Sequence, residues 1–188
     1  MLKNLNPYLN AELLHVLRSM GHGDELILVD CNFPSDSVAA HTVSGKLIRM
    51  EGLNVPEVAV AILSFYQLDF FVPEPVLRMD VVGNPDEWVE CHHEMKKVVD
   101  KTSDREWKFG SIERHAFYER ARNAYAVVCA GGEPSSLADR SLCQQGDWRA
   151  ACQARSQGDG WIQSERSRFY CRDLAKVLGH QGIGFSLQ

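Results

Sequence analysis

The sequence has no excess of positive charge and no long apolar run. Its 188 residues carry a formal net charge of -5, which gives no support to a nucleic-acid or membrane-surface partner. No stretch approaches the roughly 18 apolar residues of a transmembrane helix, and the first residues lack the apolar region of a secretory signal. We therefore expect a cytoplasmic protein with one main domain.

Metal-binding and disulfide motifs are also missing. The six cysteines include no Cys-x-x-Cys pair, so in a cytosolic chain we expect them to be reduced. Cys91-His92-His93 invites a metal interpretation, but adjacent side chains on a helix diverge and one ion cannot easily take all three. Metal-ligand spacing is absent around His15, His41, His115 and His180, and we predict no metal site. The cysteines are Cys31, Cys91, Cys129, Cys143, Cys152 and Cys171.

What is present is an alternation of helical and strand patterns. Asn10 can cap a first helix, and Asn54, Pro56 and Glu57 open another. Alternation of this kind predicts an α/β layered sheet. Helices are expected from residue 11 to 20, from 54 onward, over 86–102 and over 115–124, and strands over 25–30, 46–50, 73–82, 107–112 and 125–130.

A glycine-flanked histidine just before the buried strand 25–30 is the leading site candidate. Gly21 and Gly23 leave the ring of His22 open to a small ligand, and histidine is the side chain whose ordinary pKa lies nearest neutrality. Asp30 follows the strand, at the sheet edge where ligands usually bind. Two plainer interpretations stay open: His22 as a residue that caps the C-terminus of the helix, and Asp30 as an N-cap or turn residue.

The character of the chain changes at Gly131-Gly132. Seven of the eight glutamines lie in residues 144–188, and helical or strand periodicity fades, with only a weak helical pattern over 169–178. The sequence thus predicts one domain over residues 1–132 and an atypical tail over 133–188. That tail is either a disordered extension or a foreign reading frame.

Two separated motifs in residues 1–132 carry a family resemblance. Gly21-His22-Gly23-Asp24-Glu25, with Asp30 and Asn32-Phe33-Pro34, precedes the run from Ile112 to Ala121, Ile-Glu-Arg-His-Ala-Phe-Tyr-Glu-Arg-Ala. In this order they resemble the L-fucose mutarotase (RbsD/FucU) family. The resemblance implies a three-layer α/β/α sandwich with a mixed sheet and a homo-oligomeric, often decameric, ring. It also implies interconversion of the anomers of a monosaccharide without a metal or organic cofactor.

The resemblance also assigns roles to four residues. His22 is the expected proton donor, Asp30 and Arg114 are expected to bind sugar, and Tyr118 resembles the tyrosine of the fucose-type branch. Mutarotation delivers a proton to the ring oxygen while another leaves the anomeric hydroxyl, which suits a histidine near a carboxylate. Alternatively, Arg114 pairs with Glu113 in solvent and Tyr118 merely packs on the sheet. Asp24 either orients His22 or forms a surface ion pair.

Beyond Gly132 the family's usual Tyr-x-Asn segment and final strand are not recognisable. We therefore expect an irregular tail that leaves the sheet with an exposed edge and weakens activity. The alternative function is a non-catalytic sugar-binding or regulatory module. A monosaccharide isomerase or lyase is a third possibility, but its metal-ligand cluster is missing. The run from Phe117 to Arg120 favours L-fucose over ribose only by resemblance.

Overall fold

A computed structural model describes residues 3–102, 105–131 and 183–188. Helices and strands alternate along the chain, and each of the expected helices and strands through residue 131 is present, with bounds a few residues shorter at most ends. The helices are α1 (Ala11–Ser19), α2 (Ser35–Ala39), α3 (Val55–Leu63), α4 (Glu90–Thr102) and α5 (Arg114–Asn123). The strands are β1 (Leu26–Val29), β2 (Leu47–Glu51), β3 (Val76–Met79), β4 (Phe109–Ile112), β5 (Ala126–Gly131) and β6 (Gly184–Leu187).

The strands form one mixed sheet in the order β2-β5-β1-β6-β3-β4. β5 runs parallel to both β1 and β2, and β3 runs parallel to β4. β6 lies between β1 and β3 and is antiparallel to both. The other five strands consequently share one direction, so that their carboxyl ends meet at one edge of the sheet.

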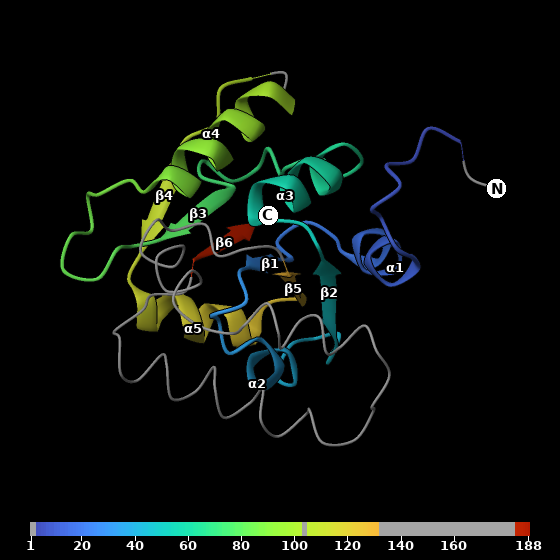
Figure 1. The fold of residues 1–188 in the computed structure, drawn as a ribbon, viewed down its shortest axis with the longest axis horizontal. Helices are drawn as coiled ribbons and strands as arrows, with labels where there is room; N and C mark the ends of the chain where they lie inside the picture. The colour runs from blue at the N-terminus through green and yellow to red at the C-terminus, as the bar shows by residue number, and fades with distance from the viewer. Residues whose placement is uncertain (1–2, 103–104, 132–182) are drawn as a thin grey trace.

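Helices cover both faces of this sheet, giving the expected three layers (Figure 1). All four residues of β1 are buried, because alternate side chains of a central strand enter opposite apolar layers. Leu26 and Leu28 pack with α1, α3 and α4, whereas Ile27 and Val29 pack with α2 and α5. The predicted α/β/α sandwich is confirmed.

Local capping signals explain why two of the helices begin where they do. The Asn10 side chain accepts a hydrogen bond from the backbone N–H of Leu13 at 2.8 Å. Asn54 and Glu57 form a reciprocal capping box, each side chain accepting from the other residue's N–H, at 2.9 and 2.8 Å. These bonds satisfy backbone donors that a helix start otherwise leaves exposed.

We expected residues 133–188 to supply no strand that closes the sheet. This expectation is wrong, because β6 lies within that range and pairs with β1 and β3. Phe185 and Leu187 are fully buried in the core, and the Ser186 hydroxyl donates to the Glu25 carboxylate at 2.9 Å. Four residues are too few to show a strand period, and the buried Ser186 breaks the apolar run. Residues 133–182 of the predicted tail, including the helical pattern over 169–178, lie outside the described residues.

Candidate functional site

His22 lies in the turn between α1 and β1, at the amino end of the strand. Gly23 takes a φ of 84°, a left-handed conformation that glycine adopts without strain. The turn leaves the His22 side chain 68% exposed, with Nδ1 only 3.1 Å from Oδ2 of Asp69. An exposed ring with a single fixed carboxylate partner is well suited to exchanging protons with a ligand.

Asp69 is itself held in place by backbone groups. The Phe71 N–H donates to its Oδ1 at 2.9 Å, and its own N–H donates to the Gln188 carbonyl at 2.7 Å. The Phe71 N–H holds the pKa of Asp69 below its ordinary value, with a smaller contribution from His22. Asp69 therefore faces His22 as a carboxylate at neutral pH.

The loop that carries Asp69 also surrounds His22 with aromatic rings. Phe70 and Phe71 lie edge-on to the imidazole, with ring centroids 6.1 and 4.8 Å away, and both are exposed. Burial raises the pKa of Tyr66, and the charges of Asp24 and Asp69 raise it further. His22 is thus bordered by two apolar rings, and Tyr66, which senses the charge of the Asp69 carboxylate, stays protonated at neutral pH.

Asp24 does not orient His22. Its carboxylate accepts a hydrogen bond from the Gly21 N–H at 2.8 Å, and Asp69 is the carboxylate that contacts the ring. Asp69 is not among the site residues that the sequence predicts. Its one available signal was a carboxylate placed between Leu68 and Phe70 in an otherwise apolar stretch.

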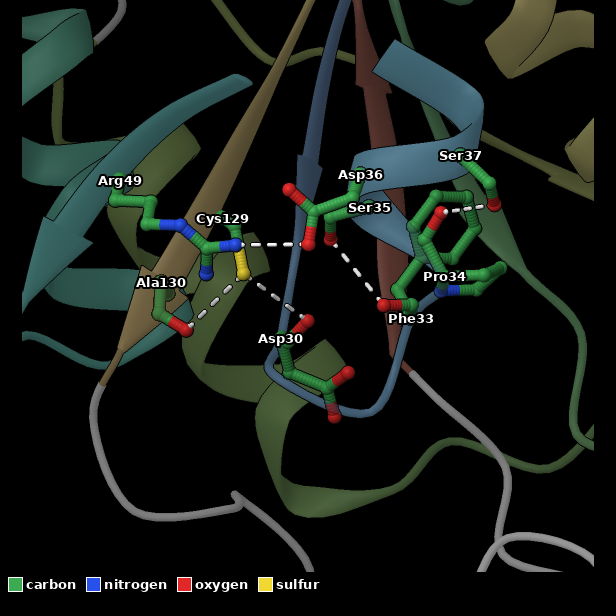
Figure 2. A network of polar contacts seen from close by, with 9 residues as sticks. All are labelled: Asp30, Phe33, Pro34, Ser35, Asp36, Ser37, Arg49, Cys129 and Ala130. Carbon is green, nitrogen blue, oxygen red and sulfur yellow. Dashed lines mark hydrogen bonds and ion pairs between the residues drawn. The ribbon is translucent and has the colours of Figure 1, made fainter. Parts of the chain in front are cut away.

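Asp30 lies at the carboxyl end of β1 and is 5% exposed. Its N–H donates to the Ile183 carbonyl at 3.1 Å, and its Oδ1 accepts from the Asn32 N–H at 3.1 Å. Figure 2 shows the Asp30 carboxylate turned away from the Cys129 thiol, which contacts the Asp30 carbonyl instead at 3.5 Å. Asp30 is an anchored turn residue whose carboxylate has a fixed direction.

Arg114 begins α5, two residues after β4 ends at Ile112. The Glu113 side chain caps the helix by accepting from the N–H groups of His115 and Ala116, at 2.7 and 3.0 Å. These two bonds lower the pKa of Glu113, that from Ala116 contributing most. The Nε atom of Arg114 is buried without a hydrogen-bond partner among the described residues. A buried donor of this kind is suited to an incoming oxygen atom.

Tyr118 follows Arg114 by one turn of α5. Its ring lies edge-on to Phe33, with centroids 5.1 Å apart. Burial raises the pKa of Tyr118, the Arg114 charge opposes that rise, and the Asp30 charge adds to it. The tyrosine therefore packs on its neighbours and also senses both charges. Asp30, Arg114 and Tyr118 form one cluster at the carboxyl edge of the sheet.

His22 and this cluster lie at opposite ends of β1. The antiparallel register pairs Leu26 with Leu187 and Val29 with Gly184. Asp69, which contacts His22, bonds to Gln188 just past one end of β6, whereas Asp30 bonds to Ile183 just before the other. The structure thus unites three of the four predicted site residues and leaves His22 apart from them within one chain.

The Cys91-His92-His93 stretch is a structural part of α4. Cys91 and His92 are buried, and burial, together with the charges of Arg78 and His93, lowers the pKa of His92 to about 4. Within residues 3–102, 105–131 and 183–188, no group of three potential metal ligands is found. No helix in these ranges is long and apolar enough to cross a membrane.

The amino-acid sequence of this chain is similar to those of known proteins over most of its length. The model of the RbsD / FucU transport protein family matches residues 3–136. An L-fucose mutarotase from Actinobacillus pleuropneumoniae is 37% identical over 131 residues, which is 70% of this chain and 88% of that protein.

Solved structures show the same likeness. FucU from Bifidobacterium longum has a TM-score of 0.63 and 34% identity, covering 69% of this chain and 90% of its own. The fucose mutarotase from Streptococcus pneumoniae, solved in complex with L-fucose, has a TM-score of 0.61 and 34% identity, covering 70% and 89%. The similarity therefore spans nearly the whole of these proteins.

Proposed function

The chain belongs to the RbsD/FucU family, and we propose that it is a mutarotase that interconverts the α and β anomers of L-fucose. The observation that carries the proposal is the presence of two sets of groups. One is the exposed His22, which contacts the Asp69 carboxylate. The other is a separate cluster of side chains suited to binding sugar hydroxyls, namely Asp30, Arg114 and Tyr118. Relatives named as L-fucose mutarotases support the reaction and the sugar. We also propose a cytoplasmic location.

The proposed reaction opens and recloses the sugar ring by proton transfer. His22 accepts the proton of the anomeric hydroxyl and delivers it to the ring oxygen as the bond between that oxygen and C1 breaks. The C1–C2 bond then rotates, and the aldehyde recloses on the other face by the reverse of these two transfers. Arg114 donates to sugar oxygens through its rigid guanidinium, and Asp30 accepts from hydroxyl groups. Tyr118, kept protonated, can both donate and accept hydrogen bonds.

Two copies of the chain are needed to bring these groups to one sugar. His22 and the Asp30 cluster face opposite edges of the sheet, so the His22 end of one copy must meet the carboxyl edge of another. The exposed rings of Phe70 and Phe71, beside His22, offer apolar area for such a contact. We propose a homo-oligomeric ring whose sites lie between neighbouring copies.

Saturation-transfer NMR of L-fucose with the full chain tests the function. Saturating the α-anomer signal should reduce the β-anomer signal when protein is added, and D-ribose should respond less. His22→Ala should abolish this exchange while the fold remains, because the ring is largely exposed. Sugar binding without exchange in the unaltered chain would instead support the non-catalytic module, and undiminished exchange in folded His22→Ala would remove His22 from the mechanism.

A further inference from the structure

The two nitrogen atoms of the His22 ring occupy different surroundings. Nδ1 faces Asp69 at 3.1 Å, while the side chain as a whole is 68% exposed. We propose that Asp69 is a positioning residue that fixes the tautomer of His22, so that Nδ1 carries the proton and Nε2 is presented to the sugar as the proton acceptor. This inference rests on the proposed mutarotase function.

Asp69 can act only as an acceptor toward the ring. Its Oδ1 is occupied by the Phe71 N–H, which leaves Oδ2 for His22. A carboxylate carries no proton to donate, so a neutral imidazole at this distance must place its own proton on Nδ1. The carboxylate therefore selects one of the two tautomers.

The surroundings also hold the two partners in this geometry. Asp69 is buried, with its side chain 8% exposed, and its N–H is tied to the Gln188 carbonyl. The rings of Phe70 and Phe71 stand edge-on to the imidazole at 82° and 79°, which restricts rotation of the His22 ring. A preset ring needs less reorganisation when the proton moves.

Among the described residues, neither Asp24 nor Tyr66 competes with Asp69 for the ring. Asp24 has its carboxylate turned to the Gly21 N–H. Burial raises the pKa of the Tyr66 phenol, and the charges of Asp24 and Asp69 raise it further, so Tyr66 stays protonated and is not a second anionic acceptor. Asp69 is thus the carboxylate that defines which His22 nitrogen bears the proton.

Replacing the carboxylate with an amide should invert the tautomer. In Asp69→Asn, the amide oxygen can keep the Phe71 N–H, and the amide nitrogen then faces Nδ1 of His22 as a donor. Nδ1 must accept, so the ring proton moves to Nε2. A comparable change in a serine-protease triad leaves the geometry intact and lowers turnover through the wrong tautomer. We expect the rate of L-fucose anomer exchange to fall by about 10- to 100-fold, with a smaller change in sugar affinity.

Nitrogen-15 NMR of the histidine ring tests the proposal without depending on activity. In the neutral form of the ring, the full chain should show His22 protonated at Nδ1, and Asp69→Asn should show it protonated at Nε2. The matched control is Asp100→Asn, which removes the carboxylate paired with Lys96 on α4 and should change neither tautomer nor exchange rate. His22→Ala assigns the resonances.

The outcomes separate this inference from the function on which it rests. A neutral His22 protonated at Nε2 in the unaltered chain overturns the role of Asp69, even if the variant fails to fold. Unchanged exchange and tautomer in folded Asp69→Asn overturn it as well, while leaving the mutarotase intact. An Nδ1-protonated ring in a chain that does not exchange L-fucose anomers supports the positioning by Asp69 and overturns only the proposed function.

Discussion

Arg114 carries a buried Nε–H with no hydrogen-bond partner among the described residues. A buried donor left unsatisfied is unfavourable, and a sugar oxygen would relieve it. Arg114→Ala should therefore weaken L-fucose binding by about 1.5–3 kcal/mol, the usual range for a hydrogen bond to a charged group. The exchange rate should be measured as a function of L-fucose concentration. In Arg114→Ala the concentration at half-saturation should rise, and the rate at saturation should stay largely unchanged.

Arg122 on the same helix provides the control. It is exposed and pairs with Glu119 at 2.7 Å, so Arg122→Ala should leave sugar affinity unchanged. Unchanged saturation with lost turnover in Arg114→Ala would contradict the binding role and indicate that Arg114 takes part in the proton transfer.

Among the secondary-structure elements, β6 depends on close packing at one glycine. A Cβ atom added at Gly184 would lie 2.5 Å from two atoms of the Phe117 ring and 3.3 Å from Val29 Cγ1. Phe117 is fully buried, so its ring has little room to move. Gly184→Ala should lower the free energy of unfolding by about 1–3 kcal/mol, as overpacked cores do.

Urea denaturation followed by circular dichroism measures this effect. Gly21→Ala is the matched control for stability, because the nearest atom to its added Cβ is Asp24 Oδ2 at 3.9 Å. An equally stable Gly184→Ala variant would mean that β6 does not pack against Phe117 in solution.

These elements differ in how far the sequence could reveal them. The helices that begin at Ala11 and Val55 can be predicted because each has an N-cap residue whose bonding partner lies only three residues further along. β1 can be predicted from its unbroken apolar run. α2 was missed because Pro34 and Ser35 resemble a loop and the helix has five residues. β6 was missed because its burial depends on partners far away in the chain, such as Glu25 for Ser186.

The candidate site, like β6, could be predicted only where the signal is local in the sequence. Gly21 and Gly23 mark His22 because an open backbone is visible in the sequence itself. The contact between His22 and Asp69 joins residues 47 positions apart, and no local pattern indicates it. The sequence places His22 before β1 and Asp30 after it, but it could not show which distant residues join each of them, because those neighbours depend on the order and direction of the other strands.

At the scale of the whole molecule, a site formed by two copies of the chain predicts that two inactive or weakened variants restore each other's activity when they are mixed. His22→Ala and Arg114→Ala each damage a different half of the shared site. When the two variants are unfolded, mixed and refolded together, hybrid oligomers should contain some sites with both residues intact. L-fucose exchange in the mixture should exceed the sum of the separately refolded variants. Exchange no greater than that sum would contradict a site that is shared between copies.

The position of β6 also has a consequence for the order of folding. β6 stands between β1 and β3, so the β2-β5-β1 group and the β3-β4 pair join one sheet only through it. Ser186 and its partner Glu25 are separated by 161 positions, and contacts this distant close late because chain entropy opposes them. During synthesis, the two parts of the sheet must wait unjoined until the residues after 183 emerge, with the flanks of β1 and β3 open to pairing with other chains.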